Sequence, residues 1–449
     1  MMQNADVVVL GGSAAGVTAA LTAKRHYPGK RVLLVRQEQK VLIPCGIPYI
    51  FGTVGSPDKN LIPDALLEKA QIDLLITEAM SLDRGAKVLG TKQGDIAYEK
   101  LILATGSLPS KPPIPGADLD GVFTIAKDVE HLLRLQARLR DAKDVVIIGG
   151  GFIGIEFADE IMKMGGKAIT VVEVELHCLS LSYDPEFCEE AEAMLRSRGI
   201  GIRTSLRVEA IHGNRGVEAV ALRGGEILKA DVVILGTGAV ANVHLAHAAG
   251  LTIGASGAIK VDRTMRTSDP DIFACGDCAK KFSFFGGRVS TLKLASIATL
   301  EARIAAANLY GITRENPGTV GVWSTAIGDL ALGTAGLTET AAKEGGYDVV
   351  TAVVEGPNRH PGGMPGGASM KVKLVFERHS SVLLGGQVRG NSVAGELLNV
   401  IAACVQKRMM AEDIAMFQMG THPALTASPV AYPLTNAAEL AIGVLRGKA

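Results

Sequence analysis

The sequence predicts an α/β fold in which two copies of a strand–glycine turn–helix unit are followed by an α+β domain. Each copy begins with a short apolar run and a glycine-rich turn, residues 6–16 in the first and 144–154 in the second. Each closes with another apolar run that ends in Thr-Gly, at Gly106 and at Gly238. From about residue 320 the pattern changes and indicates antiparallel strands with helices.

The first glycine-rich turn is flanked by the elements of a dinucleotide-binding unit. It consists of Gly11, Gly12, Ser13, Ala14, Ala15 and Gly16. The run Asp6–Leu10 predicts a strand before it, the alanine-rich stretch after it predicts a helix to about His26, and Arg31–Val35 predicts the next strand. These elements fall within ~30 residues, as in units where a pyrophosphate lies at the helix N-terminus.

The second strand of such a unit normally ends in an acid that binds a ribose. Here Arg36 stands at that position, and Glu38 is the candidate replacement two residues on. We therefore assign Arg36, Gln37 and Glu38 to the adenosine end of the first nucleotide.

The second copy carries a complete G-x-G-x-x-G between the strand Asp144–Ile148 and a helix. Its residues are Gly149, Gly151, Phe152, Ile153 and Gly154. The next strand, Ala168–Glu173, ends in Glu173. A carboxylate there accepts from a ribose 2′-hydroxyl and repels a 2′-phosphate, so we expect NADH, with NADPH as the alternative.

The spacing of the closing segments indicates an internal duplication. Ala104, Thr105 and Gly106 close the first copy 95 residues after Gly11, and Gly238 closes the second 89 residues after Gly149. We therefore expect a first nucleotide-binding domain from residues 1–112 and 256–320, a second from 113–255, and a C-terminal domain from 321–449.

A Gly-Asp pair follows a short apolar run near residue 275. Gly276 and Asp277 precede a helical segment, and an acid so placed can bind a ribityl hydroxyl of a flavin. Cys275 and Cys278 also form a C-x-x-C, for which the alternatives are a thioredoxin-like redox pair or a zinc site. Zinc is disfavoured because no second ligand pair follows at finger-like spacing, and we assign no metal.

Cys45 lies in the stretch Val41–Tyr49. Pro44 and Pro48 stiffen the backbone around it, and Gly46 permits close approach by a large group. A rigidly held thiol beside a flavin indicates a redox centre. The alternative is a buried structural cysteine, since thiols are among the most buried side chains.

Composition excludes several classes of protein. The 449-residue chain has zero net charge and no basic tract, which argues against a nucleic-acid partner. No apolar run approaches the ~18 residues of a membrane span, and the N-terminus lacks a charged segment before an apolar stretch, so we expect a cytoplasmic protein. Six scattered cysteines are not a disulfide framework.

The C-terminal region is expected to form an α+β domain of about 120 residues. The predicted strands are Val322–Thr325, Asp348–Glu355, Ser369–Glu377 and Leu383–Val388, and the predicted helices are Glu396–Lys407 and Ala411–Phe417. The glycine- and proline-rich loop Gly356–Gly367 is expected to be mobile or ligand-facing.

Together these motifs resemble the flavoprotein pyridine nucleotide-disulfide oxidoreductases over essentially the whole chain. The Ala-Thr-Gly, the Gly-Asp pair and a late His422-Pro423 occur in that family's order. A second cysteine is missing, since Ile50 stands where C-x4-C would place it. The segment Cys45–Tyr49 is therefore similar to the single-cysteine branch, which includes coenzyme A disulfide reductase, NADH oxidase, NADH peroxidase and persulfide or polysulfide reductases.

The resemblance implies FAD in the first domain, NADH or NADPH in the second, and a homodimer formed through the third. The implied activity is reduction of a small-molecule disulfide, persulfide or polysulfide through Cys45, with coenzyme A as a substrate or an adduct on that thiol. An NADH oxidase or peroxidase is the alternative, although Ala14 stands where those members carry a histidine. A further alternative is a flavin-bearing redox sensor or electron-transfer protein.

The resemblance also implies roles for residues around the nicotinamide and coenzyme A. Phe152 corresponds to an aromatic gate over the nicotinamide, its alternative being a core aromatic, and Glu156 to an acid near that ring. Lys24 and Arg25 correspond to a basic pair that binds the coenzyme A nucleotide, their alternative being a solvated helix end.

Two late residues correspond to groups that the partner subunit supplies. His422 matches a general base that protonates the leaving thiol, although Ala427 stands where its orienting glutamate would be. Tyr432 falls where a phenol lies beside the substrate sulfur. The alternatives are a capping or interface histidine and an interface aromatic.

Overall fold

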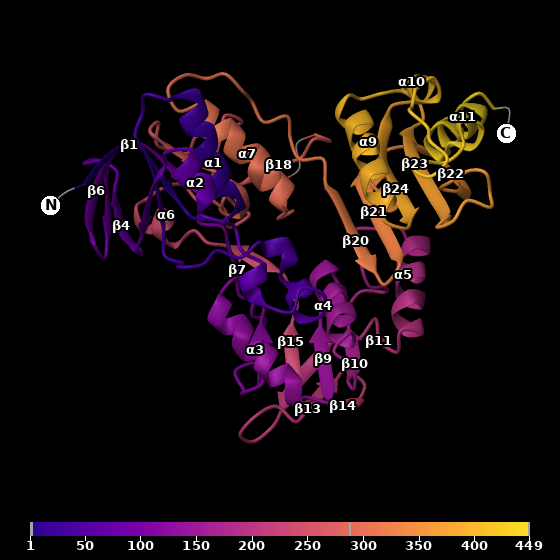
Figure 1. Ribbon diagram of the computed structural model, residues 1–449, viewed down its shortest axis with the longest axis horizontal. Helices are drawn as coiled ribbons and strands as arrows, with labels where there is room; N and C mark the ends of the chain where they lie inside the picture. Colours follow the sequence, from indigo (N-terminus) through magenta and orange to yellow (C-terminus); the bar gives the residue numbers. More distant parts are fainter. Residues whose placement is uncertain (1–2, 287–288, 448–449) are drawn as a thin grey trace. The chain divides into compact units, whose positions relative to one another are not determined.

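The computed structural model describes residues 3–286 and 289–447. The chain forms two compact units, each assembled from segments distant in sequence and therefore drawn in contrasting colours in Figure 1. The first unit comprises Met1–Pro113, Phe123–Ala142 and Thr237–Thr319, and the second comprises Ile114–Val122, Lys143–Gly236 and Val320–Ala449.

A seven-stranded sheet of order β3-β2-β1-β6-β5-β4 forms the centre of the first unit, with β17 pairing β6 outside this path. Its strands are β1 (Gln3–Leu10), β2 (Val32–Arg36), β3 (Asp73–Ile76), β4 (Ala79–Asp83), β5 (Val88–Thr91), β6 (Gly94–Leu103) and β17 (Ile272–Ala274). β3, β2, β1, β6 and β17 are parallel. Residues Val7–Leu10 are all buried, as expected for a parallel strand covered on both faces.

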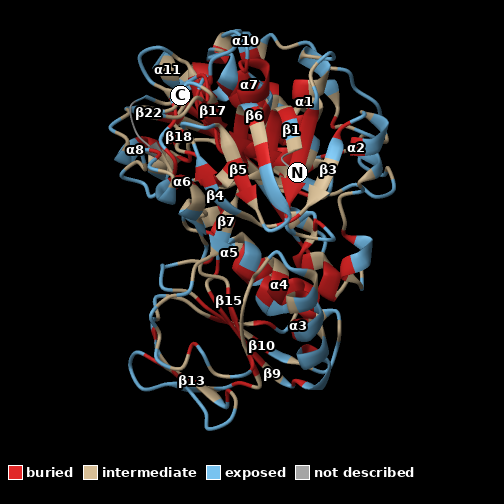
Figure 2. Ribbon diagram, turned by 90° about the vertical axis from the view of Figure 1, so that its left-hand side faces the viewer, coloured by how far each residue is buried: buried red, intermediate tan, exposed pale blue. Residues whose placement is uncertain are grey.

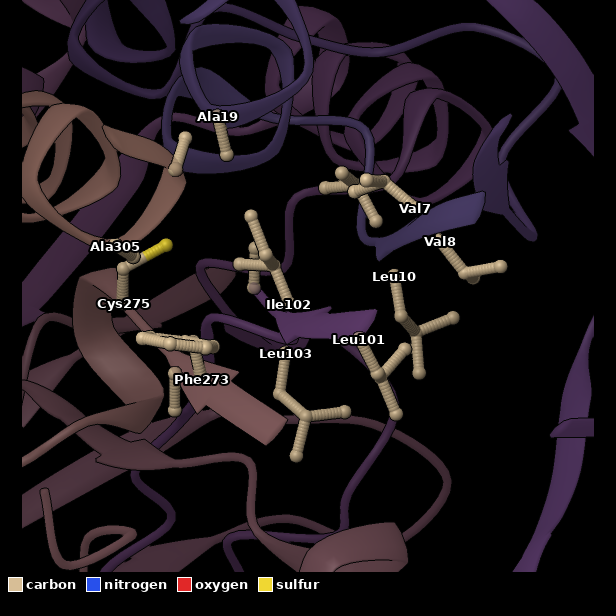
Figure 3. Packing of buried hydrophobic residues seen from close by; sticks show 14 of the residues in the cluster. Val7, Val8, Leu10, Ala19, Leu101, Ile102, Leu103, Phe273, Cys275 and Ala305 are labelled. Carbon is tan, nitrogen blue, oxygen red and sulfur yellow. The ribbon is translucent and has the colours of Figure 1, made fainter. Parts of the chain in front are cut away.

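Two alanine-rich helices pack together in this unit, α1 (Ala14–His26) and α7 (Ala295–Ala307). Small side chains allow the helix backbones to approach closely. Figure 3 shows Ala19 of α1 and Ala305 of α7 in the same core as side chains of β1, β6 and β17. The other elements of the first unit are α2 (Ala65–Lys69), α3 (Val129–Asp141), α6 (His244–Ala248), β7 (Ser107–Pro109), β16 (Ala239–Ala241), β18 (Lys281–Phe282) and β19 (Val289–Ser290).

The second unit contains a sheet of order β11-β10-β9-β15-β8, in which β11, β10, β9 and β15 are parallel. Its strands and helices are β8 (Val122–Thr124), β9 (Asp144–Ile148), β10 (Ala168–Val172), β11 (Gly201–Arg203), β15 (Val232–Leu235), α4 (Phe152–Met162) and α5 (Pro185–Ser197). A small antiparallel sheet of β12 (Val208–His212), β13 (Ala219–Leu222) and β14 (Ile227–Lys229) shares a core with it. Figure 2 shows buried residues in the strands and also in helices such as α4 and α7, while many of the connecting loops are exposed.

The C-terminal part of the second unit is an antiparallel sheet of order β20-β21-β24-β23-β22. Its elements are β20 (Val322–Ile327), β21 (Leu330–Gly336), α8 (Glu339–Glu344), β22 (Val349–Pro357), β23 (Ser369–Glu377), β24 (Leu383–Gly390), α9 (Ala394–Gln406), α10 (Ala411–Ala415) and α11 (Pro433–Leu445). Helix α9 packs on β21 and β24, and α11 packs on β22 and β23. The four strands and two helices expected here are confirmed within a few residues. Three elements, β21, α8 and α11, were not predicted.

Within the second unit, a buried polar network joins α5 to this antiparallel sheet. The Lys373 ammonium lies 3.0 Å from the Asp184 carboxylate and 2.8 Å from that of Glu339. Gln387 accepts a hydrogen bond from the Asp184 backbone at 2.8 Å, and Thr340 donates to the Asp184 carboxylate. These contacts explain why residues 143–236 and 320–449 cluster as one unit.

No helix within residues 3–286 and 289–447 is long and apolar enough to cross a bilayer. The boundaries expected from the sequence, 1–112 with 256–320, then 113–255 and 321–449, stay a prediction.

Replacing Lys373 by methionine should destabilise the second unit by ~3–5 kcal/mol, because it leaves the buried Asp184 carboxylate without its counter-ion. Urea denaturation followed by the fluorescence of Trp323, the single tryptophan, measures the effect in this unit. The control is Lys343→Met, which removes an exposed pair with Glu339 and should cost at most ~0.5 kcal/mol. Equal losses of unfolding free energy in Lys373→Met and Lys343→Met would show that Lys373 is not needed as the counter-ion of Asp184.

Candidate functional site

The first glycine-rich turn holds the strand end and the helix start too close for side chains. A Cβ on Gly16 would lie 1.8 Å from the carbonyl oxygen of Gly11, and one on Gly11 would lie 2.2 Å from that of Ala104. Gly11 also has φ +123°, which favours glycine. Helix α1 therefore begins directly after the turn, and its first amides, which have no intrahelical acceptor, are available to an anion.

Four parallel strands of the first unit end side by side at this turn. The Gly11 amide donates to Val35 of β2, the Ala104 amide to Leu10 of β1, and the Cys275 amide to Leu103 of β6. The predicted segments at 11–16, 104–106 and 276–277 thus meet at the carboxyl edge of the sheet, where open α/β sheets bind their ligands.

Arg36 is buried at the end of β2 and lies against the turn. A Cβ on Gly12 would lie 2.5 Å from Arg36 Cδ. The guanidinium binds both carboxylate oxygens of Asp64, at 2.6 and 2.8 Å, and donates to the Glu38 carbonyl. Gln37 is exposed beside them. Contact of Arg36, Gln37 and Glu38 with an adenosine stays a prediction, and the sequence did not identify Asp64 as the partner of Arg36.

Asp277 is linked to the start of β7. Ser107 Oγ donates to the Asp277 carboxylate at 2.7 Å, and Lys127 Nζ lies 3.5 Å from it. Gly276 has φ +77°, and a Cβ on it would lie 2.9 Å from that of Ala15 in α1. The Gly-Asp turn therefore lies directly against the start of α1, and contact of Asp277 with a flavin stays a prediction.

Cys275 and Cys278 are completely buried beside this turn. Burial raises the pKa of both thiols. A thioredoxin-like pair needs an accessible thiolate, so these two thiols are core residues rather than an exchange site.

Cys45 is exposed at the surface of the first unit. It lies in a 3-10 turn, Pro44–Gly46, which a second one, Pro48–Phe51, follows directly. The buried side chain of Asn60 fixes this turn, donating to the Ile43 carbonyl at 2.9 Å and leaving no room for a Cβ on Gly46. The alternative of a buried structural cysteine is wrong.

The second glycine-rich turn repeats the close contact of the first. A Cβ on Gly154 would lie 1.8 Å from the carbonyl oxygen of Gly149. The Glu173 carboxylate at the end of β10 accepts from the amides of Gly150, at 2.5 Å, and Glu175, at 2.9 Å. These bonds aim the carboxylate at the helix start, where a nucleotide ribose would lie.

Gly238 belongs to the first unit, where its carbonyl accepts from the Ser110 amide at 2.9 Å. The residue that ends β15 beside the second turn is Gly236. Its amide donates to Ile148, and a Cβ on it would lie 3.5 Å from Cα of Gly154. Contact of Gly238 with a nucleotide stays a prediction, and the sequence did not identify Gly236 as the residue beside the second turn.

Phe152 and Glu156 lie on α4, where both contact neighbours in the second unit. The ring of Phe152 is 6.0 Å from that of Tyr183 and 6.1 Å from that of Trp323. Thr325 donates to the Glu156 carboxylate at 2.9 Å, and burial raises the pKa of Glu156 to about 7. Ile153 is more than one-third exposed.

His422 and Tyr432 lie in the C-terminal part of the second unit. His422 is exposed, and its Nδ1 accepts from the Ala424 amide at 3.2 Å, so the neutral ring carries its proton on Nε2. Tyr432 precedes α11 and accepts from the Asn436 amide through its carbonyl. Burial raises the pKa of the Tyr432 phenol.

Lys24 and Arg25 lie in the last turn of α1, at the end opposite the glycine turn. Lys24 Nζ donates to the carbonyls of Pro28 at 3.2 Å and Lys30 at 3.3 Å. Arg25 is exposed. The Lys24 contacts are those of a helix-end lysine, and coenzyme A binding by this pair stays a prediction.

Comparisons with known proteins agree with this geometry. The family model described as pyridine nucleotide-disulphide oxidoreductase matches residues 5–302, and the family's dimerisation domain matches 322–431. An NAD(P)H sulfur oxidoreductase (CoA-dependent) of Pyrococcus abyssi is 33% identical over 443 residues, 97% of each chain. An NADH oxidase of Methanocaldococcus jannaschii is 31% identical over 98% of this chain and 99% of its own.

A solved structure, that of an NAD-dependent persulfide reductase from A. fulgidus, has a TM-score of 0.91 and 30% identity to this chain. It covers 99% of this chain, which spans 84% of that one. The chain therefore belongs to the pyridine nucleotide-disulphide oxidoreductase family, whose members use FAD and NAD(P)H. At both glycine turns a helix begins directly after a strand, so the first amides of α1 and α4 are available to a pyrophosphate, and this arrangement fits two such dinucleotides.

The raised pKa of Glu156 makes the stability of the second unit depend on pH. Between its unperturbed pKa of 4.5 and about 7, the folded chain binds more protons than the unfolded chain, so stability falls as pH rises. Glu156→Gln cannot ionise and keeps an acceptor for Thr325. Relative to the parent, the variant should gain about 2 kcal/mol between pH 5 and pH 8.

Urea denaturation at the two pH values, monitored by Trp323 fluorescence, checks this change. Glu175→Gln, which removes an exposed carboxylate, is the control and should show almost no pH-dependent difference. A Glu156→Gln difference that is the same at both pH values would show that the carboxylate is ionised throughout.

Proposed function

We propose that this FAD-dependent NAD(P)H oxidoreductase reduces small-molecule disulfides, persulfides or polysulfides, with coenzyme A disulfide or persulfide as the preferred class. The observation that carries the proposal is the exposure of Cys45 while the other five cysteines are buried. This thiol follows the end of β2 by nine residues, and β2 ends beside the first glycine turn. The names of the Pyrococcus and A. fulgidus relatives support the same class of substrate.

When bound, FAD takes a hydride from NAD(P)H and makes two electrons available to a sulfur acceptor. The Cys45 thiolate attacks one sulfur of the substrate S–S bond, and the other sulfur leaves as a thiolate that takes up a proton. The product on Cys45 is a mixed disulfide or a persulfide. Two electrons cleave that new S–S bond, which restores the Cys45 thiolate and releases the second thiol after it takes up a proton.

The chain's own contribution at Cys45 is orientation. Pro44 and Pro48 restrict the backbone on either side, and Asn60 anchors it through Ile43. A thiolate held this way meets a substrate without first losing conformational freedom, which favours attack along a fixed direction. Because the other five cysteines are buried, the second sulfur must come from a small molecule rather than from the chain.

We propose that the working form is a homodimer in which His422 and Tyr432 reach the partner's Cys45. The match to a dimerisation domain supports this. So do three exposed apolar side chains nearby, Met416, Leu425 and Val430, which are 77%, 64% and 88% exposed. His422 offers an Nε2–H, which can donate to a leaving thiolate.

A second candidate function is reduction of oxygen, because the Methanocaldococcus relative carries the name NADH oxidase. Ala14, in the first turn of α1, has no group that could donate a proton to a peroxide. Sulfur reduction is therefore the better-supported function. Oxygen uptake with NADH, compared with thiol release from coenzyme A disulfide, separates the two.

Cys45→Ser should abolish reduction of coenzyme A disulfide, by ~10³-fold or more, because a serine hydroxyl neither ionises nor exchanges with sulfur near neutral pH. The flavin spectrum should be retained. Cys404→Ala, which removes a buried thiol in α9, should keep turnover. Undiminished turnover in Cys45→Ser, or oxygen uptake that exceeds thiol release in the parent, would overturn the proposed function.

Glu173→Gln should reduce the preference for NADH over NADPH, expressed as the ratio of kcat/KM values, by about tenfold. The amide keeps one acceptor for the ribose hydroxyl but no longer repels a 2′-phosphate. The charge-matched control is Glu175→Gln, two residues along. Steady-state kinetics with both nucleotides measures the ratio, and a change confined to Glu175→Gln would move the role to that residue.

A further inference from the structure

A buried ion pair holds the peptide of Gly276 from both sides. The Glu301 carboxylate accepts from the Gly276 amide at 2.9 Å, and the Lys281 ammonium donates to the Gly276 carbonyl. Lys281 also lies 2.5 Å from the same carboxylate oxygen of Glu301. Glu301 is completely buried and Lys281 is 4% exposed.

Burying this ion pair in the core carries a large desolvation cost. Removing two charges from water costs several kcal/mol per ion, and apolar residues of similar volume often serve stability as well or better. The second carboxylate oxygen of Glu301 is buried without a hydrogen-bond partner among the described residues. Burial raises the pKa of Glu301 to about 7, against the attraction of Lys281. We therefore look for the role of the ion pair in the Gly276 peptide, which both residues bind.

What it holds is the turn that presents Asp277. Gly276 has φ +77° and lies against Ala15 at the start of α1, so a shift of its peptide would move the turn relative to the helix N-terminus. Asp277 follows directly in the sequence, and its carboxylate accepts a hydrogen bond from Ser107, the first residue of β7. Glu301 comes from α7, which packs along α1. The ion pair thus ties α7 to the Gly276–Asp277 turn, which contacts the start of α1 and Ser107.

We propose that Lys281 and Glu301 are positioning residues for the flavin, which fix the Gly276 peptide and so set Asp277 against the N-terminus of α1. This rests on FAD binding at the first glycine turn, but not on which sulfur compound is reduced. No sequence pattern indicated this ion pair, because its members lie 20 residues apart and each is an ordinary charged residue.

The test compares flavin affinity with stability in three variants of the full chain, Lys281→Met, Glu301→Gln and the double variant Lys281→Met/Glu301→Met. Flavin is removed, the apoprotein is titrated with FAD, and the dissociation constant is read from quenching of flavin fluorescence. The visible circular dichroism of the bound flavin and the melting temperature of the apoprotein are recorded alongside. Lys100→Met, which breaks a half-buried pair with Asp271 in the same unit, is the control.

Both single variants should weaken FAD binding about tenfold or more, as expected when charge-assisted hydrogen bonds are lost. The double variant should recover the melting temperature of the parent apoprotein, because it leaves no unpaired charge, and should still bind FAD weakly with altered flavin dichroism. This variant keeps the proposal testable if a single variant fails to fold. Lys100→Met should bind FAD like the parent.

Two results would overturn the proposal: a double variant that binds FAD within about twofold of the parent, or an equal loss of affinity in Lys100→Met. A parent chain that does not bind FAD would overturn it together with the proposed function. A parent that binds FAD but does not turn over coenzyme A disulfide would overturn the proposed function and leave the positioning role standing.

Discussion

The structure depends on a contact between backbones that only glycine permits, made once in each nucleotide-binding part. Gly16 lies against the carbonyl of Gly11, and Gly154 lies against that of Gly149, each where a Cβ would be 1.8 Å from oxygen. Because of this contact a helix starts immediately after a buried strand, and its unsatisfied amides point to the same edge as the carboxyl ends of the neighbouring strands. In the first unit that edge also collects the ends of β6 and β17, and with them Thr105, Ser107 and Asp277.

The sequence predicted this framework because its signals are local. A β-branched run, a glycine turn and an alanine-rich helix can be recognised within ~30 residues, and Cys45 stood out through its flanking prolines. The partners of these residues could not be predicted the same way. Asp64 binds Arg36 from 28 residues away, and Asn60, which fixes the Cys45 turn, is an ordinary residue in a polar loop.

The unpredicted elements of the C-terminal part have a similar explanation. Strand β21 has the sequence Leu-Ala-Leu-Gly-Thr-Ala-Gly, in which small residues hide the strand pattern until β20 and β24 pair with it. Helix α11 begins at a proline after Tyr432 and is defined by packing on β22 and β23. The net charge of zero likewise does not indicate the two buried ionic clusters around Lys281 and Lys373. Each cluster joins residues that are separated in the sequence.

The burial of five cysteines has a consequence for the proposed reaction with reactive sulfur compounds. Polysulfides and disulfides modify any thiolate that they can reach, without regard to its role. In this chain burial raises the pKa of the other five thiols, Cys178, Cys188, Cys275, Cys278 and Cys404. Burial thus protects these five thiols, so that the proposed sulfur substrate reacts with only one sulfur atom per chain.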